Sequence, residues 1–293
     1  MQTRLDKMKF LRPLAWHSAL LQQVLRLCCF CVIGFFYTAA ISQTNPPTNM
    51  PLSPTLIQTF APTGKLRVGI NLGNPVLASQ ELGTGAPKGV SVDIANAIGK
   101  QAGVAIDFQL FKSAGATVEA MKNGSLDLIF VAIDPVRGAD ISYTPPYIQI
   151  EGAYLVKSNS PFQKNDEVDR PGNEIVVGKG SAYDLFLTRE IKQASLIRVA
   201  SSPAVVAEFM SGKGNVAAGV KQQLEVDAKR YTNVRLLPGR FMVINQAIGT
   251  PKERANSAEI TSYLSAIITN LKSSGFVAEA MKRHQIEGAR VAE

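Results

Sequence analysis

From Lys65 onward, short apolar runs alternate with segments of helical periodicity, and the links between them are short. Apolar runs of this length, bounded by turn residues, are typical of buried strands. The runs that we interpret as strands are 66–70, 104–110, 126–132, 175–177, 197–200, 216–220, 234–237 and 241–249. Helical patterns begin near Asp93, Thr117, Tyr183, Ser202, Leu224 and Asn256. This alternation predicts an α/β fold with mostly parallel sheets and right-handed crossovers.

The run 126–132 ends at Asp134 and Pro135, where proline stops further strand pairing. Arg137 follows within one turn. A guanidinium just past the end of a buried strand is well placed to bind an anion, because it can grip a carboxylate through two parallel hydrogen bonds. The residues alone leave a second interpretation open, in which Arg137 only pairs with Asp134 or Asp140 on the surface.

The segments LDLIF, DPVRGADISYTPPY and EGAYLV follow one another in this order along the chain. In this order they resemble the bacterial extracellular solute-binding proteins, family 3, of amino-acid ABC transporters. The resemblance runs from about Gly64 to the C-terminus. It implies a two-lobed, periplasmic-binding-protein-like (type II) fold, in which each lobe is a mostly parallel sheet flanked by helices. The first lobe would comprise residues 63–152 plus 243–293 and the second residues 153–242, with the ligand cleft between them.

The same resemblance assigns roles to individual residues. Arg137 takes the place of the arginine that holds the ligand's carboxylate. On the second lobe, Ser181 and Ala182 through their backbone N–H groups, together with Tyr183, would meet that carboxylate. Taken alone, the glycine-rich entry 178–181 is either a helix N-terminus that binds an anion or a plain strand-to-helix turn.

Two asparagines follow the first strand, at the sheet edge where ligands sit in open α/β folds. Asn71 and Asn74 are therefore candidates for binding, although asparagine is also a common turn residue. Gln222 falls near the position where relatives carry an acid for the ligand's ammonium group. Asp134 either supplies the missing anion or buttresses Arg137. We favour an amino acid or close derivative as ligand, and a carboxylate without an amine is the alternative.

The N-terminus has the pattern of a secretory signal over residues 1–42: five cations precede an uncharged run, and small residues follow it. An uncleaved anchor is the alternative. Residues 43–62 are rich in proline and predict an extended linker. All three cysteines lie in the leader, so the mature chain would hold no disulfide. These features predict a periplasmic location.

Other function classes find little support. The leader carries half of the formal charge of +8, and no basic stripe predicts nucleic-acid binding. The mature chain has one histidine, His284, so we expect no metal site, no catalytic residues and no cofactor. We assign Asp93 to capping a helix. The expected partner is an inner-membrane ABC transporter permease, with the protein a monomer. The alternatives are a secreted enzyme of the dehydratase type and a ligand sensor that acts in trans.

Overall fold

The computed structural model of the chain describes residues 52–293, which belong to one compact unit. The predicted signal peptide and residues 43–51 of the predicted linker lie outside the described residues. Within 52–293, none of the helices has both the length and the apolar character that crossing a bilayer requires.

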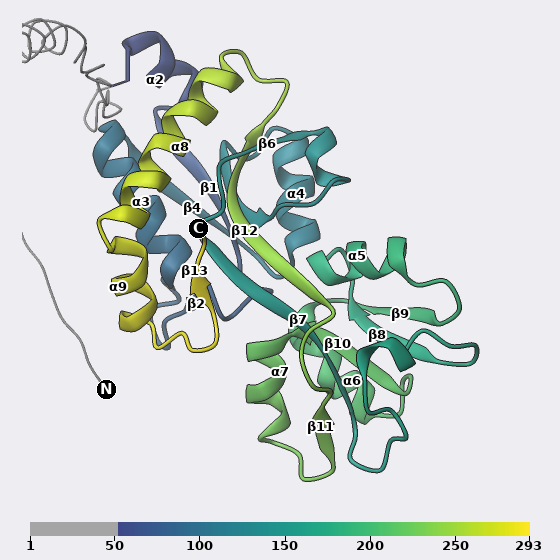
Figure 1. Cartoon of the computed structure of the whole chain (residues 1–293). Coiled ribbons are helices and arrows are strands. Elements are labelled where there is room, and N and C mark those ends of the chain that lie inside the picture. Colours follow the sequence, from purple (N-terminus) through teal and green to yellow (C-terminus); the bar gives the residue numbers. More distant parts are fainter. Residues whose placement is uncertain (1–51) are drawn as a thin grey trace, which may run out of the picture. The chain divides into compact units, whose positions relative to one another are not determined.

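An eleven-stranded sheet organises this part of the chain (Figure 1). Eight strands follow one another in the order β4 (Ala105–Phe111), β1 (Lys65–Asn71), β5 (Leu128–Ala132), β12 (Met242–Pro251), β7 (Ile148–Lys157), β10 (Val216–Val220), β8 (Glu174–Gly178) and β9 (Ser195–Val199). β6 (Ile141–Tyr143) pairs with β12, while β11 (Val234–Leu236) and β13 (Arg290–Val291) pair with β7. A separate hairpin joins β2 (Ser79–Gln80) to β3 (Pro87–Lys88).

Two parallel sets of strands are joined by a long antiparallel pair. β1 runs parallel to β4 and β5, and β8 runs parallel to β9 and β10. β7 and β12 run antiparallel to each other and to the parallel strands beside them. The predicted α/β class with mostly parallel halves is therefore confirmed.

Helices flank the sheet. They are α2 (Pro54–Phe60), α3 (Val90–Ala102), α4 (Ala114–Lys122), α5 (Ala182–Glu190), α6 (Val205–Met210), α7 (Lys221–Ala228), α8 (Ser257–Ser273) and α9 (Phe276–Arg283). Single 3-10 turns cover Arg137–Ala139, Asn165–Glu167 and Ser202–Ala204. α3, α8 and α9 contact one another and lie together in Figure 1. The apolar residues of their inner faces join the largest core cluster.

Two predicted helix starts need correction. α4 begins at Ala114 rather than at Thr117, because Ser113 precedes it and its hydroxyl accepts a hydrogen bond from the N–H of Ala116. Asp93 does not cap α3, whose N-cap is Gly89. Instead, its carboxylate contacts Arg283, the last residue of α9, and His284, the residue that follows it, each at 2.8 Å. Asp93 therefore ties two helices together.

The predicted linker is wrong for residues 52–62. Ser53 caps α2 by accepting a hydrogen bond from the N–H of Leu56, and Pro54 occupies the first turn. Proline is well tolerated there, because its fixed φ suits a helix start and its missing N–H would be unpaired anyway. Leu52, Leu56 and Phe60 are buried in the main core. This segment is part of the folded unit.

The long strands β7 and β12 cross at a charged cluster. Met242 pairs with Gly152, and the next pair joins Val243 to Glu151. The carboxylate of Glu151 binds Lys221 at 3.2 Å and also binds Arg240. Burial alone would raise the pKa of Glu151, but these two cations outweigh it and hold that pKa below its ordinary value.

We predict that Phe60→Ala destabilises the protein by about 3–5 kcal/mol, because it removes a fully buried ring from the core. Urea denaturation of the chain measures the change in the free energy of unfolding. Gln58→Ala, at an exposed position of the same helix, is the control. Equal, small losses in both variants would restore the linker interpretation.

We predict that Glu151→Gln lowers the free energy of unfolding at neutral pH and not in acid. A depressed carboxyl pKa contributes stability above the unfolded value of about 4.3, and that contribution disappears as pH falls through the folded pKa. Denaturation curves at pH 7 and pH 3 test this, with exposed Glu225→Gln as the control. A deficit that is as large at pH 3 as at pH 7 would contradict the assigned role.

Candidate functional site

Arg137 is a buried cation whose side chain binds only backbone carbonyls. It is 5% exposed and lies in the turn that follows β5. Its Nη1 donates to the carbonyl oxygen of Ala132 at 3.1 Å, and its Nη2 donates to that of Gly180 at 2.7 Å. Within residues 52–293, no carboxylate forms an ion pair with it, so the surface pairing with Asp134 or Asp140 is not observed. Burial lowers the pKa of Arg137.

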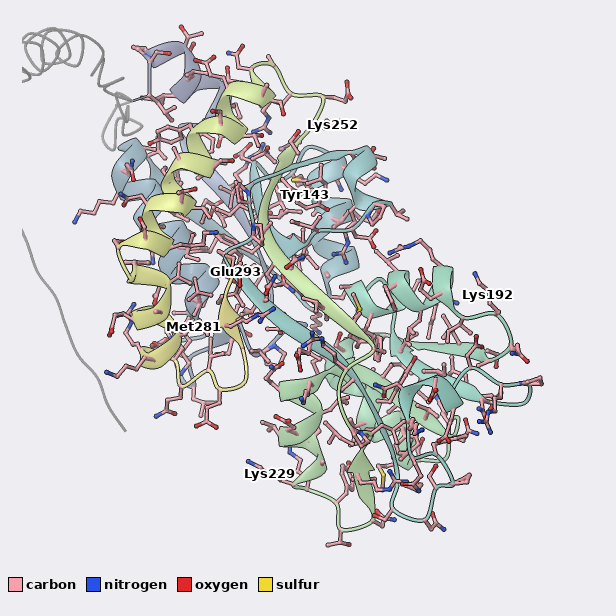
Figure 2. The ribbon with its side chains drawn as sticks, viewed as in Figure 1. Tyr143, Lys192, Lys229, Lys252, Met281 and Glu293 are labelled. Carbon is pink, nitrogen blue, oxygen red and sulfur yellow. The ribbon has the colours of Figure 1, made fainter. Side chains whose placement is uncertain are left out.

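The phenol of Tyr143 does not neutralise Arg137 either. Tyr143 lies on β6 (Figure 2), and burial raises the pKa of its hydroxyl to about 12. At neutral pH this group is therefore an uncharged phenol. Within residues 52–293, the hydrogen-bond partners of the Arg137 side chain are thus two neutral carbonyls, and Asp134 raises its pKa by less than burial lowers it.

Arg137 borders a narrow cavity of about 30 Å³. Its walls come from the end of β1, the turn after β5, the start of α5 and the middle of β12. The lining residues are Asn71, Gly73, Asn74, Ala114, Ala132, Arg137, Ser181, Ala182, Tyr183, Ser202, Val220, Ile244 and Gln246. The structure thus brings together six of the eight predicted site residues, whose role in binding a ligand stays a prediction.

The two asparagines differ in what they offer. Asn71 uses its side-chain oxygen to accept a hydrogen bond from the N–H of Gly73 at 2.9 Å, so it forms the turn after β1. Asn74 is also buried, but its side-chain oxygen has no hydrogen-bond partner within the described residues. A buried acceptor without a partner is costly, so Asn74 is the asparagine that is better prepared for a ligand.

The start of α5 forms another wall of the cavity. Ser181 caps this helix through its hydroxyl, which accepts a hydrogen bond from the N–H of Asp184 at 3.0 Å. The N–H of Ser181 itself donates to Gly178 at 3.0 Å, so the predicted anion donor is occupied. The N–H of Gly180 donates to the Asp184 carboxylate at 2.8 Å. Ser181 therefore shapes this wall and can offer its hydroxyl hydrogen.

Asp134 and Gln222 do not line the cavity. Asp134 is 4% exposed, and its carboxylate pairs with Arg189 of α5 at 3.0 Å and accepts a hydrogen bond from the N–H of Val136 at 2.9 Å. It thus holds the turn that carries Arg137, which is the buttressing role. Gln222 donates its amide to the carbonyl oxygen of Gly288 at 2.7 Å. That contact ties Gln222 to the C-terminal segment, while its side-chain oxygen is buried without a hydrogen-bond partner within the described residues. The role of Gln222 in binding a ligand stays a prediction.

Two polar lining residues escaped the sequence analysis. Gln246 lies in the middle of β12, and Ser202 lies in the turn after β9. A buried glutamine inside an apolar strand was a usable signal, since such polar groups need partners. Ser202 carried no comparable signal, because a serine before proline is common at helix starts.

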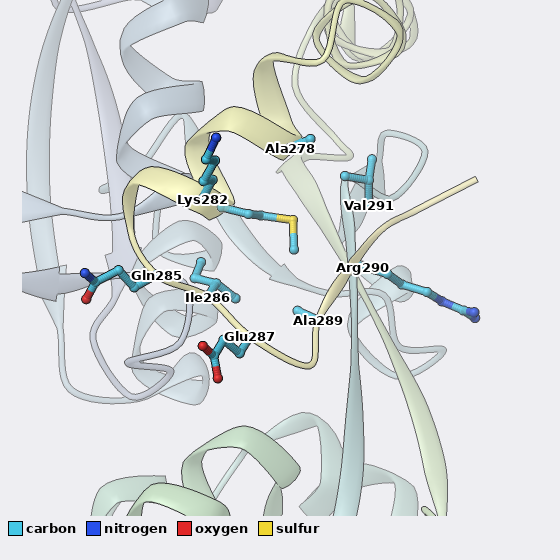
Figure 3. Close-up of a pocket in the computed structure, with 9 residues that line it drawn as sticks. Ala278, Lys282, Gln285, Ile286, Glu287, Ala289, Arg290 and Val291 are labelled. Atoms are coloured by element: carbon cyan, nitrogen blue, oxygen red, sulfur yellow. The ribbon is translucent and has the colours of Figure 1, made fainter.

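A larger hollow of about 550 Å³ lies between α9 and the C-terminal residues (Figure 3). Its charged side chains are those of Lys282, Glu287 and Arg290, which are exposed and diverge from one another in Figure 3. Ligand sites place a few polar groups so that they converge on one point. The narrow cavity at Arg137 meets that condition better and is the candidate site.

The sequence pattern of the bacterial extracellular solute-binding proteins, family 3, matches residues 66–286. The chain belongs to this family. Among curated proteins, none matches its sequence.

Solved structures of other binding proteins share the fold. A solute receptor for L-cysteine of Neisseria gonorrhoeae is 20% identical with a TM-score of 0.70, covering 81% of this chain and 99% of that one. A substrate-binding protein of an amino acid ABC transporter is 18% identical with a TM-score of 0.65, covering 75% and 98%. An ancestral amino acid-binding protein, a precursor of cyclohexadienyl dehydratase, is 17% identical with a TM-score of 0.66, covering 78% and 98%. The fold of this family 3 protein is therefore that of the type II periplasmic binding proteins.

We predict that Asp134 and Arg189 are energetically coupled, because they form an ion pair in which the carboxylate is buried. In a double-mutant cycle with Asp134→Asn and Arg189→Gln, the coupling in the free energy of unfolding should be about 1 kcal/mol or more. Thermal and urea denaturation of the four proteins measure it. A matched cycle on the exposed pair of Lys213 and Glu208 should give less. Strictly additive effects at Asp134 and Arg189 would contradict the pairing.

Proposed function

We propose that this family 3 protein is an extracytoplasmic binding protein that captures a small ligand through its carboxylate and delivers it to an ABC transporter. The observation that carries the proposal is the buried guanidinium of Arg137, whose side chain binds no carboxylate within residues 52–293. Buried charges in proteins are paired, since an isolated one loses its hydration without compensation. A ligand carboxylate would complete this pairing.

The geometry of Arg137 supports a carboxylate in particular. The side chain of Arg137 extends from the turn after β5 to the entry of α5, where its Nη2 donates to the carbonyl oxygen of Gly180. A carboxylate placed between these walls would replace the neutral carbonyl with an anion, whose two oxygens can accept two parallel hydrogen bonds from the guanidinium. The planar fork of arginine suits this exchange better than the point charge of lysine.

Binding would require the walls to part. The cavity of about 30 Å³ is far below the roughly 300 Å³ or more of small-molecule sites. We propose that residues 63–152 plus 243–293 form one lobe, that residues 153–242 form the other, and that they open about Glu151–Gly152 and Gly239–Met242. The contacts of Arg137 with Gly180 and of Asp134 with Arg189 join these proposed lobes.

A role in binding fits the cavity better than catalysis. A dehydratase needs an acid and a base near the reacting atoms. The lining residues include no histidine and no carboxylate. Tyr183 is buried, and loss of hydration is the main cause that raises the pKa of its hydroxyl. The names of the similar structures, which refer to L-cysteine and amino acid binding, support a ligand among the amino acids and their close derivatives.

We predict that Arg137→Ala weakens ligand binding by about thirtyfold or more, because removing one partner of a buried charge pair costs about 2–5 kcal/mol. Arg137→Lys should recover little of the loss. Mass spectrometry of what co-purifies with the native protein identifies the ligand, and calorimetric titration measures its affinity. Arg230→Ala, at an exposed position in the turn after α7, is the control with the same change in charge. A folded Arg137→Ala protein that binds as tightly as the wild type would overturn the proposed function.

A further inference from the structure

We infer that the ligand pairs its carboxylate with an uncharged second polar group, as in a 2-hydroxy or 2-oxo acid, and that it carries no ammonium. The inference rests on the proposed function, in which Arg137 holds the carboxylate. It is an inference about the other walls of the same cavity, and it departs from the amino acid that the sequence resemblance favours.

The lining of the cavity carries a single charge. Arg137 is its only ionised side chain, and the remaining polar groups are amides and hydroxyls. They belong to Asn71, Asn74, Ser181, Tyr183, Ser202 and Gln246. A monocarboxylate brings the total charge of ligand and lining to zero. A zwitterionic amino acid would leave one positive charge without an anion.

The buried carboxylates nearest in the chain to these walls are already committed. Asp134 pairs with Arg189, and Asp184 pairs with Arg198 at 2.9 Å while also accepting a hydrogen bond from Gly180. Both carboxylates are buried, while Arg189 and Arg198 are 34% and 40% exposed. Recruiting either carboxylate for an ammonium would take it away from the arginine and the backbone N–H groups that now hold it.

The hinge carboxylate is committed as well. Glu151 binds both Lys221 and Arg240, and it does not line the cavity. None of the residues that line the cavity is an acid, so an α-amino acid would find no carboxylate there for its ammonium.

The cavity does provide for a neutral donor. The side-chain oxygen of Asn74 is buried and lacks a hydrogen-bond partner within the described residues. A ligand hydroxyl would satisfy it without burying a charge. The amide of Gln246 and the hydroxyl of Ser202 offer further neutral contacts on the opposite walls, and either one can donate to a 2-oxo group. The rest of the lining is apolar and consists of Gly73, Ala114, Ala132, Ala182, Val220 and Ile244. The cavity is narrow, so the site suits a compact molecule.

Calorimetric titration of the purified protein against matched pairs tests the inference. Within each set the compounds share one side chain and differ only in the group on the second carbon. The sets are L-alanine, L-lactate and pyruvate, and L-leucine with its 2-hydroxy and 2-oxo analogues. We expect the deaminated member of the best-bound pair to bind at least tenfold more tightly. Tighter binding of the amino acid would overturn the inference and leave the role of Arg137 standing. Binding that Arg137→Ala leaves unchanged would overturn the proposed function instead.

A substitution that adds the missing anion sharpens the test. Asn74→Asp should shift the preference toward the amino acid by at least tenfold, since the new carboxylate would meet an ammonium. Asn233→Asp, at an exposed position outside the cavity, makes the same chemical change and should shift nothing. Circular dichroism melting shows whether each variant is folded. If Asn74→Asp does not fold, the comparison of matched pairs on the wild-type protein decides the matter alone.

Discussion

The burial of a guanidinium without a carboxylate partner is the constraint on which the candidate site depends. Arg137 gives up its hydration where β5 ends, and the carbonyl dipoles of Ala132 and Gly180 return only part of that loss. The carboxylate of Asp134 accepts a hydrogen bond from the N–H of Val136 and so stabilises the turn that carries Arg137. Its ion pair is with Arg189 and not with Arg137. The fold thus keeps a cation in place and leaves its charge available.

The crossing strands β7 and β12 explain how distant segments share one cavity. Arg137 precedes β7 in the chain, Ser181 follows it, and Gln246 lies on β12 itself. Because β7 and β12 pair through the middle of the sheet, the strand ends of both parallel sets come to the same region. Glu151, bound by two cations at this crossing, fixes the register where the proposed hinge lies. The paired strands β7 and β12 therefore bring the site residues together and would bend when the proposed lobes open.

The sequence predicted several strands well because strands such as β5 and β10 are uninterrupted apolar runs. Residues 216–220, for instance, coincide with β10. It failed at 52–62, because proline content was taken as a sign of a linker although Pro54 stands where helices tolerate it. In the site, local patterns located Arg137, Asn74 and the start of α5. The partners of Asp134 and Gln222 lie 55 and 66 residues away along the chain, and no local pattern specifies such pairings.

The contact between Arg137 and Gly180 also bears on which ligand can enter. A ligand carboxylate takes the place of a carbonyl oxygen, so it strengthens an existing interaction rather than creating a new cation site. An ammonium on the same ligand would stand a few ångströms from the guanidinium. Two like charges about 5 Å apart repel by about 3 kcal/mol at an effective dielectric constant of about 20. In most binding sites for amino acids an acid must offset that repulsion. Here the carboxylates of Asp134 and Asp184 are neutralised by Arg189 and Arg198, so the repulsion stands. In the proposed function, the arginines that neutralise Asp134 and Asp184 would thereby favour a ligand without an ammonium.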